Sequence, residues 1–296
     1  MSINWGLKTT WDTFTGIKTL SHSPVGMVGG NSQAVAVLDL ETGRYGSSYE
    51  AGENQLLHRV ANTVNNIFCL TGWNTCTLHK LDPQTFNPVG SYEVEGLIDF
   101  AVDDGRLYTL LCTNESTTVQ ELNPSTLEYM TTVQMAAGTF GRIVSKNGKV
   151  AAYSTDGKDT NLGVFTKDLS GPFTKTVIQN DIPNFFQADP QGWLYSSFRT
   201  APGLYSYCLS PFQQQGAWTN IPMNRYPDSS SLHFLGDEIF LSSYASCSVY
   251  QNDVQLSLKG TLPNSTTTLA FGSMQDNQLL CATPNSLQIY SKGDHA

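Results

Sequence analysis

The chain has 296 residues, of which 40% are hydrophobic and only 14% are charged, against roughly 25% in typical soluble domains. Its net charge of −9 leaves no basic stripe to neutralise phosphates, so nucleic acid is not an expected partner. No apolar run is long enough to cross a bilayer, and we expect no membrane insertion. Asn, Gln, Ser and Thr are plentiful, which favours β-rich binding or assembly proteins whose surfaces act through hydrogen bonds.

The N-terminal stretch MSINWGLKTTWDTF lacks the basic start and apolar stretch of a secretory signal, which predicts synthesis in a reducing cytosol. The cysteines show neither a CxxC motif nor metal-type spacing. Most lie in apolar, strand-like runs, so we expect reduced and buried thiols, with a Cys69–Cys76 bridge across one hairpin as the alternative. The six are Cys69, Cys76, Cys112, Cys208, Cys247 and Cys281.

A hexamer recurs along the chain: LDLETG at 38–43, LDPQTF at 81–86 and LNPSTL at 122–127. The spacing is about 42 residues, in the range of structural repeats. Each copy joins two strand-like segments, and its Asx residue can cap the local backbone, so each predicts a strand–turn–strand hairpin. The same spacing continues to weaker turns near Asp168, Ser210, Asn252 and Lys292.

A second series of tight turns alternates with these hairpins and leads into apolar strands. Together the two series give four short strands per unit, and seven units account for nearly the whole chain. The apolar residues follow a two-residue period, which excludes an α-solenoid. The second series comprises VNNIFCLTG (64–72), DDGRLYTLL (103–111), KNGKVAAYS (146–154), PQGWLYSSF (190–198), GDEIFLSSY (236–244) and QDNQLLCAT (275–283).

Four-stranded units at this spacing are typical of β-propeller blades. The hexamers resemble the D-x-x-T-G turns of the YVTN and quinoprotein-like propeller superfamily, over about 250 residues. The resemblance implies an all-β, seven-bladed propeller of four-stranded antiparallel blades. The expected strand ends carry no Trp-Asp dipeptide of the WD-repeat kind, and the tryptophan-docking motifs of quinoproteins are missing, so no cofactor is expected.

The chain is expected to form one propeller domain over 1–296, with blades of about 42 residues from 11 to 296. After the turn near Lys292 no sequence remains for the last blade's fourth strand. Residues 3–10 have no unit of their own, so we expect them to close the ring as that strand.

Two sets of residues are candidates for binding. Aligning the innermost strands by their turns places Val60, Asp99, Arg142, Phe186, Leu232 and Phe271 at one level of the channel. This predicts an Asp99–Arg142 ion pair on the channel wall, with His58 and His233 nearby. Loops on the b–c and d–a end of the blades carry Trp73, Arg199 and Tyr226, residue types that are common at recognition hot spots.

No catalytic or metal-binding motif was found in the sequence. The leading interpretation is a non-catalytic interaction or assembly module that binds a protein, as a component of a virus or phage particle. One alternative is a lactonase-like hydrolase acting at the channel, with candidates in the d–a connections at Glu53, Glu95, Asn180, Asp181 and Asp228. The other is a carbohydrate-binding protein, because exposed rings can stack on sugars.

Overall fold

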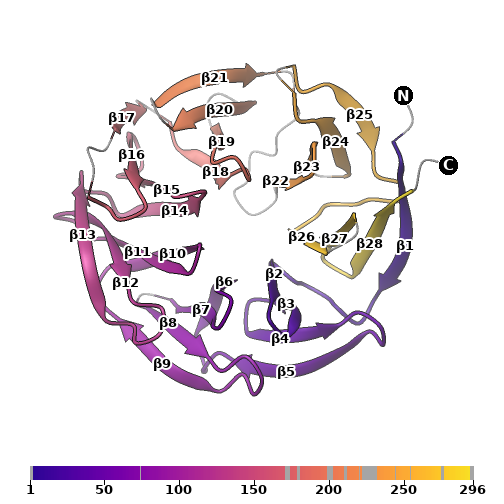
Figure 1. The fold of residues 1–296 in the computed structure, drawn as a ribbon, viewed down its shortest axis with the longest axis horizontal. Helices are drawn as coiled ribbons and strands as arrows, with labels where there is room; N and C mark the ends of the chain where they lie inside the picture. Colours follow the sequence, from indigo (N-terminus) through magenta and orange to yellow (C-terminus); the bar gives the residue numbers. More distant parts are fainter. Residues whose placement is uncertain are drawn as a thin grey trace.

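The computed structural model describes residues 3–73, 75–170, 174–178, 181–198, 203–209, 212–219, 221, 232–243, 245–253, 255–274 and 277–293. Within these ranges the regular structure consists of seven four-stranded antiparallel sheets, with no helix. The sheets stand around a central channel like blades (Figure 1). The predicted all-β, seven-bladed propeller is therefore confirmed.

In six blades the strands follow chain order from the channel outward, and we call these positions a to d. Blade 1 is β2 (Thr19–Ser23), β3 (Gly26–Gly30), β4 (Ala34–Asp39) and β5 (Arg44–Glu50). Blade 2 is β6 (Leu56–Asn62), β7 (Ile67–Gly72), β8 (Cys76–Leu81) and β9 (Pro88–Glu93). Blade 3 is β10 (Leu97–Asp103), β11 (Arg106–Cys112), β12 (Thr117–Leu122) and β13 (Tyr129–Met135).

The remaining blades have the same plan. Blade 4 is β14 (Phe140–Lys146), β15 (Lys149–Thr155), β16 (Thr160–Thr166) and β17 (Thr174–Ile178). Blade 5 is β18 (Pro183–Ala188), β19 (Leu194–Phe198), β20 (Leu204–Leu209) and β21 (Phe212–Trp218). Blade 6 is β22 (Leu232–Leu235), β23 (Glu238–Ser242), β24 (Cys247–Gln251) and β25 (Leu258–Thr261). Blade 7 combines β26 (Ala270–Met274), β27 (Gln278–Ala282) and β28 (Leu287–Lys292) with β1 (Trp5–Trp11).

The N-terminal strand closes the ring. β1 pairs antiparallel with β28, with Trp5 opposite Lys292 and Trp11 opposite Leu287, and forms the outer edge of blade 7 (Figure 1). The predicted closing strand is thus confirmed. Without it, β28 would expose its unpaired backbone groups at the edge of the sheet.

A buried carboxylate fastens the closing strand to blade 6. Trp5 is 4% exposed, and its Nε1 donates to Glu238 Oε2 at 2.7 Å. Lys259 Nζ donates to Glu238 Oε1 at 2.5 Å, and Lys292 Nζ lies 3.1 Å from Oε2. Burial raises the pKa of Glu238, but hydrogen bonds from Lys259, Trp5 and Lys292 outweigh it and hold this pKa below its ordinary value. One carboxylate thereby joins blade 6, blade 7 and the N-terminal strand.

The repeated hexamers form the c–d turns, as predicted. Asp39 Oδ1 accepts from the backbone N–H groups of Glu41 and Thr42, at 2.9 and 3.1 Å. Asp82 and Asn123 accept equivalent backbone bonds in blades 2 and 3. The Asx side chain replaces partners that the turning backbone cannot supply, which explains why this residue recurs.

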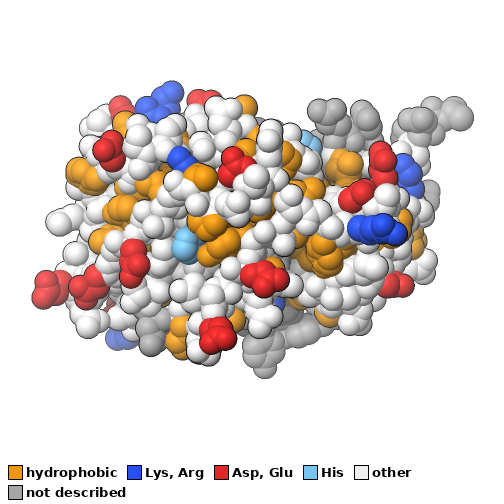
Figure 2. Space-filling model, turned by 90° about the horizontal axis from the view of Figure 1, so that it is seen from below, with side chains coloured by type: hydrophobic (Ala, Val, Ile, Leu, Met, Phe, Trp, Pro, Cys, Tyr) orange, Lys and Arg blue, Asp and Glu red, His pale blue; other side chains and the backbone are white. Residues whose placement is uncertain are grey.

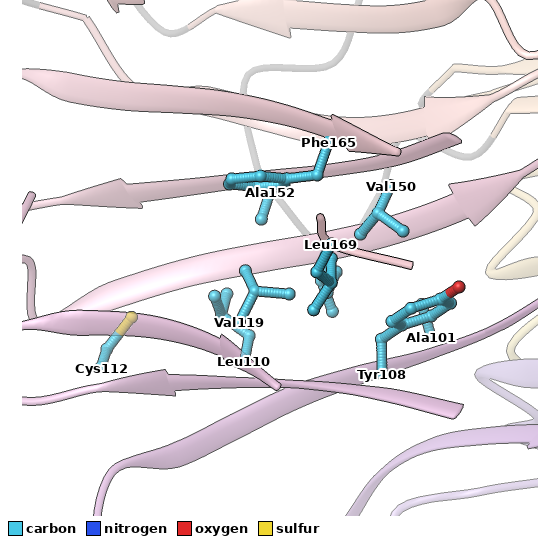
Figure 3. Close-up of a cluster of buried hydrophobic side chains, with 10 residues drawn as sticks. Ala101, Tyr108, Leu110, Cys112, Val119, Val150, Ala152, Phe165 and Leu169 are labelled. Carbon is cyan, nitrogen blue, oxygen red and sulfur yellow. The ribbon is translucent and has the colours of Figure 1, made fainter. Parts of the chain in front are cut away.

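The last hexamer residue adopts a left-handed backbone and fills a gap between blades. Phe86 and Leu127 have φ of 62° and 63°, and Leu169 in blade 4 has φ of 55°. All three are buried, and each packs against the preceding blade. Figure 3 shows Leu169 among the side chains of blades 3 and 4. These side chains therefore join neighbouring blades.

Blade 1 has a glycine at this position, and the closing strand fills the gap. Gly43 has φ of 69°, and a Cβ placed there would lie 2.3 Å from Cε3 of the Trp11 ring. The blade that precedes blade 1 is blade 7, whose outer strand ends at Trp11. Trp11 therefore occupies the place that Phe86 and Leu127 take in the next two blades.

We expect Gly43→Ala to lower the free energy of unfolding by about 2 to 3 kcal/mol in urea denaturation. The added Cβ meets Trp11 and also forces a non-glycine residue into a left-handed backbone, which alone costs about 1 kcal/mol. Gly105→Ala is the matched control, because Gly105 has φ of 74° and nothing lies within 4 Å of its Cβ position. Equal destabilisation by the two variants would show that Trp11 does not fill this gap.

The described cysteine side chains are buried free thiols: Cys69, Cys76, Cys112, Cys247 and Cys281. Burial raises the pKa of Cys69 to about 12 and that of Cys112 to about 11, so these thiols are poor nucleophiles. Cys69 faces His79 across the β7–β8 ladder, whereas Cys76 faces Gly72. The alternative Cys69–Cys76 bridge therefore does not join cross-strand partners. The side chain of Cys208 lies outside the described part.

Candidate functional site

Three blades meet at Asp99 on the channel wall. The Asp99 carboxylate is 1% exposed and forms an ion pair with Arg59 Nη1 of blade 2, at 3.0 Å. Its Oδ2 also accepts from the backbone N–H of Ile143 in blade 4, at 2.9 Å. Arg59 Nη1 in turn donates to the carbonyl of Ile143 at 3.1 Å. The predicted pairing of Asp99 with Arg142 is wrong, because Arg59 holds that position.

The inner strands had been aligned one residue out of place in blade 2. β6 and β10 each shift register at a bulge, between Leu57 and Arg59 and between Leu97 and Asp99. Arg59 and Asp99 both directly follow the bulge, so they are equivalent positions. Alignment by the a–b turns instead matched Asp99 with Val60, which is buried between the blades.

Arg142 and the two histidines are not brought together with Asp99 as a single site. Arg142 Cζ lies 5.4 Å from the centre of the Phe140 ring, a cation–π contact at the start of β14. His58 is exposed on blade 2, with Nε2 2.9 Å from the Gly72 carbonyl. His233 stacks on Phe271 in blade 7, with ring centres 6.0 Å apart.

His233 is electrically neutral at physiological pH. Its Nε2 is sealed from solvent and has no hydrogen-bond partner among the described residues. Burial lowers the pKa of His233 to about 4, because the charged imidazolium would lose its hydration. The candidate channel residues Asp99, Arg142, His58 and His233 therefore do not converge on one ligand position. Asp99 instead joins blades 2, 3 and 4 through its contacts with Arg59 and Ile143.

Trp73 lies on the b–c loop of blade 2, between β7 and β8, and is 69% exposed. It borders an open hollow of about 1010 Å³ formed by three connections of blades 1 and 2. We call this end of the blades the Trp73 face. The hollow is lined by Asn31, Gln33, Ala34, Glu50, Ala51, Gly52, Glu53, Asn54, Gln55, Leu56 and Trp73.

Short-range hydrogen bonds fix the walls of the hollow. Asn31 Oδ1 accepts from the backbone N–H groups of Gln33 and Ala34, both at 2.8 Å. The Ala51 N–H donates to the Gln33 carbonyl at 2.7 Å, which joins the d–a connection to the b–c loop. Gln55 Oε1 accepts from Thr71 Oγ1 of β7 at 3.2 Å. The hollow therefore has a preformed shape, with a large indole at its border.

The other predicted members of this face are not described. Arg199 and Tyr226 lie outside the described residues, so the structure leaves their placement open. The walls of the hollow were missed by the sequence analysis, apart from Glu53, which was considered only as a metal ligand. The wall residues could have been expected from their place in the blade plan, because b–c loops and d–a connections leave from the same end of a blade.

The lactonase alternative was tested on the acidic residues of the d–a connections. No group of three or more His, Cys, Asp or Glu side chains converges as a metal site in the described part of the chain. Asp181 Oδ1 accepts from the N–H of Ile182 at 2.9 Å. Asn180 and Asp228 lie outside the described ranges. Glu53 borders the hollow beside Trp73.

Seven radial blades around a channel, with a hollow on one loop face, define a β-propeller of seven blades. A chain of the mitotic checkpoint complex is similar, with a TM-score of 0.70 and 12% identity, covering 96% of this chain and 90% of that one. BamB from Moraxella catarrhalis is similar at a TM-score of 0.62 and 13% identity, covering 95% of this chain and 84% of that one. At these identities the likeness shows the shared propeller fold.

No protein-family model matches the sequence, and no curated protein matches it. A search of the described residues for a helix long and apolar enough to span a membrane found none.

Proposed function

We propose that this propeller is a non-catalytic interaction module that binds a protein through the Trp73 face. The observation that carries the proposal is the 69% exposed indole of Trp73 at the border of a preformed hollow. Burying so large a ring on a rigid support stabilises a complex with little loss of side-chain entropy, which is why tryptophan is common at hot spots. The blades supply the rigid support, and the loops supply the recognition surface.

The loops of this face differ from blade to blade in sequence. Propellers that bind one ligand per blade repeat one motif, so the partner here should contact only part of the disc. The charge-poor, amide-rich composition supports a further proposal, that the chain is built into a larger assembly such as a virus or phage particle. Synthesis in the cytosol belongs to the same proposal.

A photo-crosslinking experiment in the cell of origin tests these proposals. With p-benzoylphenylalanine at Gln33 on the border of the hollow, we expect a crosslinked protein that co-sediments with a large assembly. Trp73→Ala should remove most of this product, because hot-spot truncation typically costs about 2 kcal/mol or more. Val89, exposed on the outer strand β9, and Asn147, on an a–b turn, provide matched control positions.

Crosslinks from Val89 or Asn147 with none from Gln33 would place the working surface on the edge or on the opposite end of the disc. In that case the proposal is wrong.

A further inference from the structure

The loops of the Trp73 face between Asn31 and Ser116 carry negative charge only, whereas Lys18, just before β2, is an exposed cation at the same end of blade 1. From Asn31 to Ser116, the b–c loops, the d–a connections and the strand ends beside them contain no Lys or Arg. They contain five exposed glutamates: Glu50, Glu53, Glu93, Glu95 and Glu115. A surface of one sign raises the local concentration of ligands of the other sign.

The other ends of the same strands carry both signs. There, Arg106 Nη1 pairs with Glu121 Oε1 at 2.9 Å, and Arg44 lies opposite Asp39 across the β4–β5 ladder. Along the edge of the disc that carries β5 and β9, acidic side chains outnumber basic ones but basic ones are present (Figure 2). The absence of basic side chains therefore belongs to the loops of the Trp73 face between Asn31 and Ser116, and the net charge of −9 does not by itself account for it.

Two of the five glutamates border the same hollow as Trp73. Glu50 ends the outer strand β5, and Glu53 lies in the d–a connection that follows it. Both are exposed, and neither forms an ion pair with any described residue. The volume of about 1010 Å³ accommodates several side chains of a partner.

We propose that this hollow binds an arginine-bearing segment of the protein partner. The guanidinium stacks on the indole of Trp73, and Glu50 or Glu53 supplies the countercharge. The inference rests on the proposed function and names the chemistry of the partner at the same site.

Arginine fits this combination better than other side chains. Its planar, permanently charged guanidinium stacks on aromatic rings and also donates paired hydrogen bonds to a carboxylate. Trp is the aromatic ring that binds cations most strongly. The amides of Asn31, Gln33 and Gln55 offer further partners for the peptide backbone of the bound segment.

The test uses full-length protein with 15N-labelled tryptophan, in which the indole N–H signals of the five tryptophans are followed by NMR. The probe is the capped peptide acetyl-Gly-Arg-Gly-Arg-Gly-amide. Its matched control replaces both arginines with citrulline, which has the same shape without the charge. We expect the arginine peptide to shift the Trp73 signal, assigned with Trp73→Phe, and the citrulline peptide to leave it unchanged.

Two charge-matched pairs of substitutions separate a local site from general attraction to an acidic protein. Glu50→Gln with Glu53→Gln should weaken binding of the arginine peptide at least tenfold. Glu41→Gln with Glu128→Gln removes the same charge from exposed residues of the c–d turns, and should change the affinity by less than twofold. Raising the salt concentration should weaken binding to the unsubstituted protein.

The inference is overturned by equal shifts with the arginine and citrulline peptides, or by equal effects of the two substitution pairs. It is also overturned by a Trp73 signal that moves with the neutral sugars maltotriose or chitotriose but not with the arginine peptide. The crosslinking from Gln33 is an independent measurement. A crosslinked partner with no arginine-dependent shift therefore leaves the proposed function standing and removes only this inference.

Discussion

A chain that lacks residues 1–10 should melt roughly 10 °C or more below the full-length protein in calorimetry or circular dichroism. The deletion removes most of β1, including Trp5, whose ring packs edge-on against Phe240 at 5.2 Å between centres. Ile3 and Leu7 pack against the same buried cluster. Burying each large apolar side chain is worth roughly 1.5–3 kcal/mol, and each kcal/mol corresponds to roughly 2 °C in a chain of this size.

The deletion also leaves Glu238 without the Trp5 N–H in a buried position. Trp5→Phe separates the two contributions, because it keeps the ring but removes the hydrogen bond. Lys8→Ala is the control, since Lys8 is exposed on the same strand and should leave the melting temperature unchanged. If the truncated chain had the same melting temperature as the full-length protein, β1 would not stabilise the ring.

The destabilisation caused by deleting residues 1–10 should depend on pH, because the pKa of Glu238 is lowered in the folded state. A carboxylate whose pKa is lower in the folded state contributes stability above its unfolded pKa, and this stability is lost as the pH falls through the folded value. The contribution is therefore present at neutral pH and lost in acid. The difference in melting temperature between the full-length and truncated chains should narrow accordingly below the ordinary glutamate pKa.

The sequence predicts the blades well because their signals are local. An Asx residue and the Thr three positions later lie within one turn, so spacing alone identifies Asp39, Asp82 and Asn123 as c–d turns. The closing strand could be predicted because a ring leaves no other place for the unmatched N-terminal segment. The exposure of Trp73 could be predicted for a similar reason, because it is a large ring in a short loop.

The channel and the hollow depend on signals that are not local. The equivalence of Arg59 and Asp99 is visible in the backbone, where each residue directly follows a bulge, whereas turn spacing in the sequence had matched Asp99 with Val60. The hollow joins Asn31, Glu53 and Trp73 from three connections. Their convergence depends on how neighbouring blades twist and pack, which spacing in a single sequence does not reveal.

Asp99→Ala should lower the free energy of unfolding by about 3 kcal/mol, the largest effect that we expect from any single substitution in the channel. Removing one partner of a buried pair costs about 3–5 kcal/mol, because the other charge and its hydrogen-bond partners are left uncompensated. The lower end applies because the Arg59 side chain is 32% exposed and can regain some hydration. Ile143 would also lose the acceptor of its N–H.

A double-substitution cycle in urea denaturation identifies the partner of Asp99. Combined with Arg59→Met, Asp99→Ala should be less damaging than the sum of the two single substitutions, with a coupling of about 1 kcal/mol or more. Combined with Arg142→Met, it should be additive within about 0.5 kcal/mol, because the Arg142 guanidinium lies over Phe140 instead. Glu95→Ala, an exposed change close to the same strand, controls for loss of charge. Coupling to Arg142 but not to Arg59 would restore the pairing expected from the sequence and contradict the three-blade contact through which Asp99 holds the channel wall together.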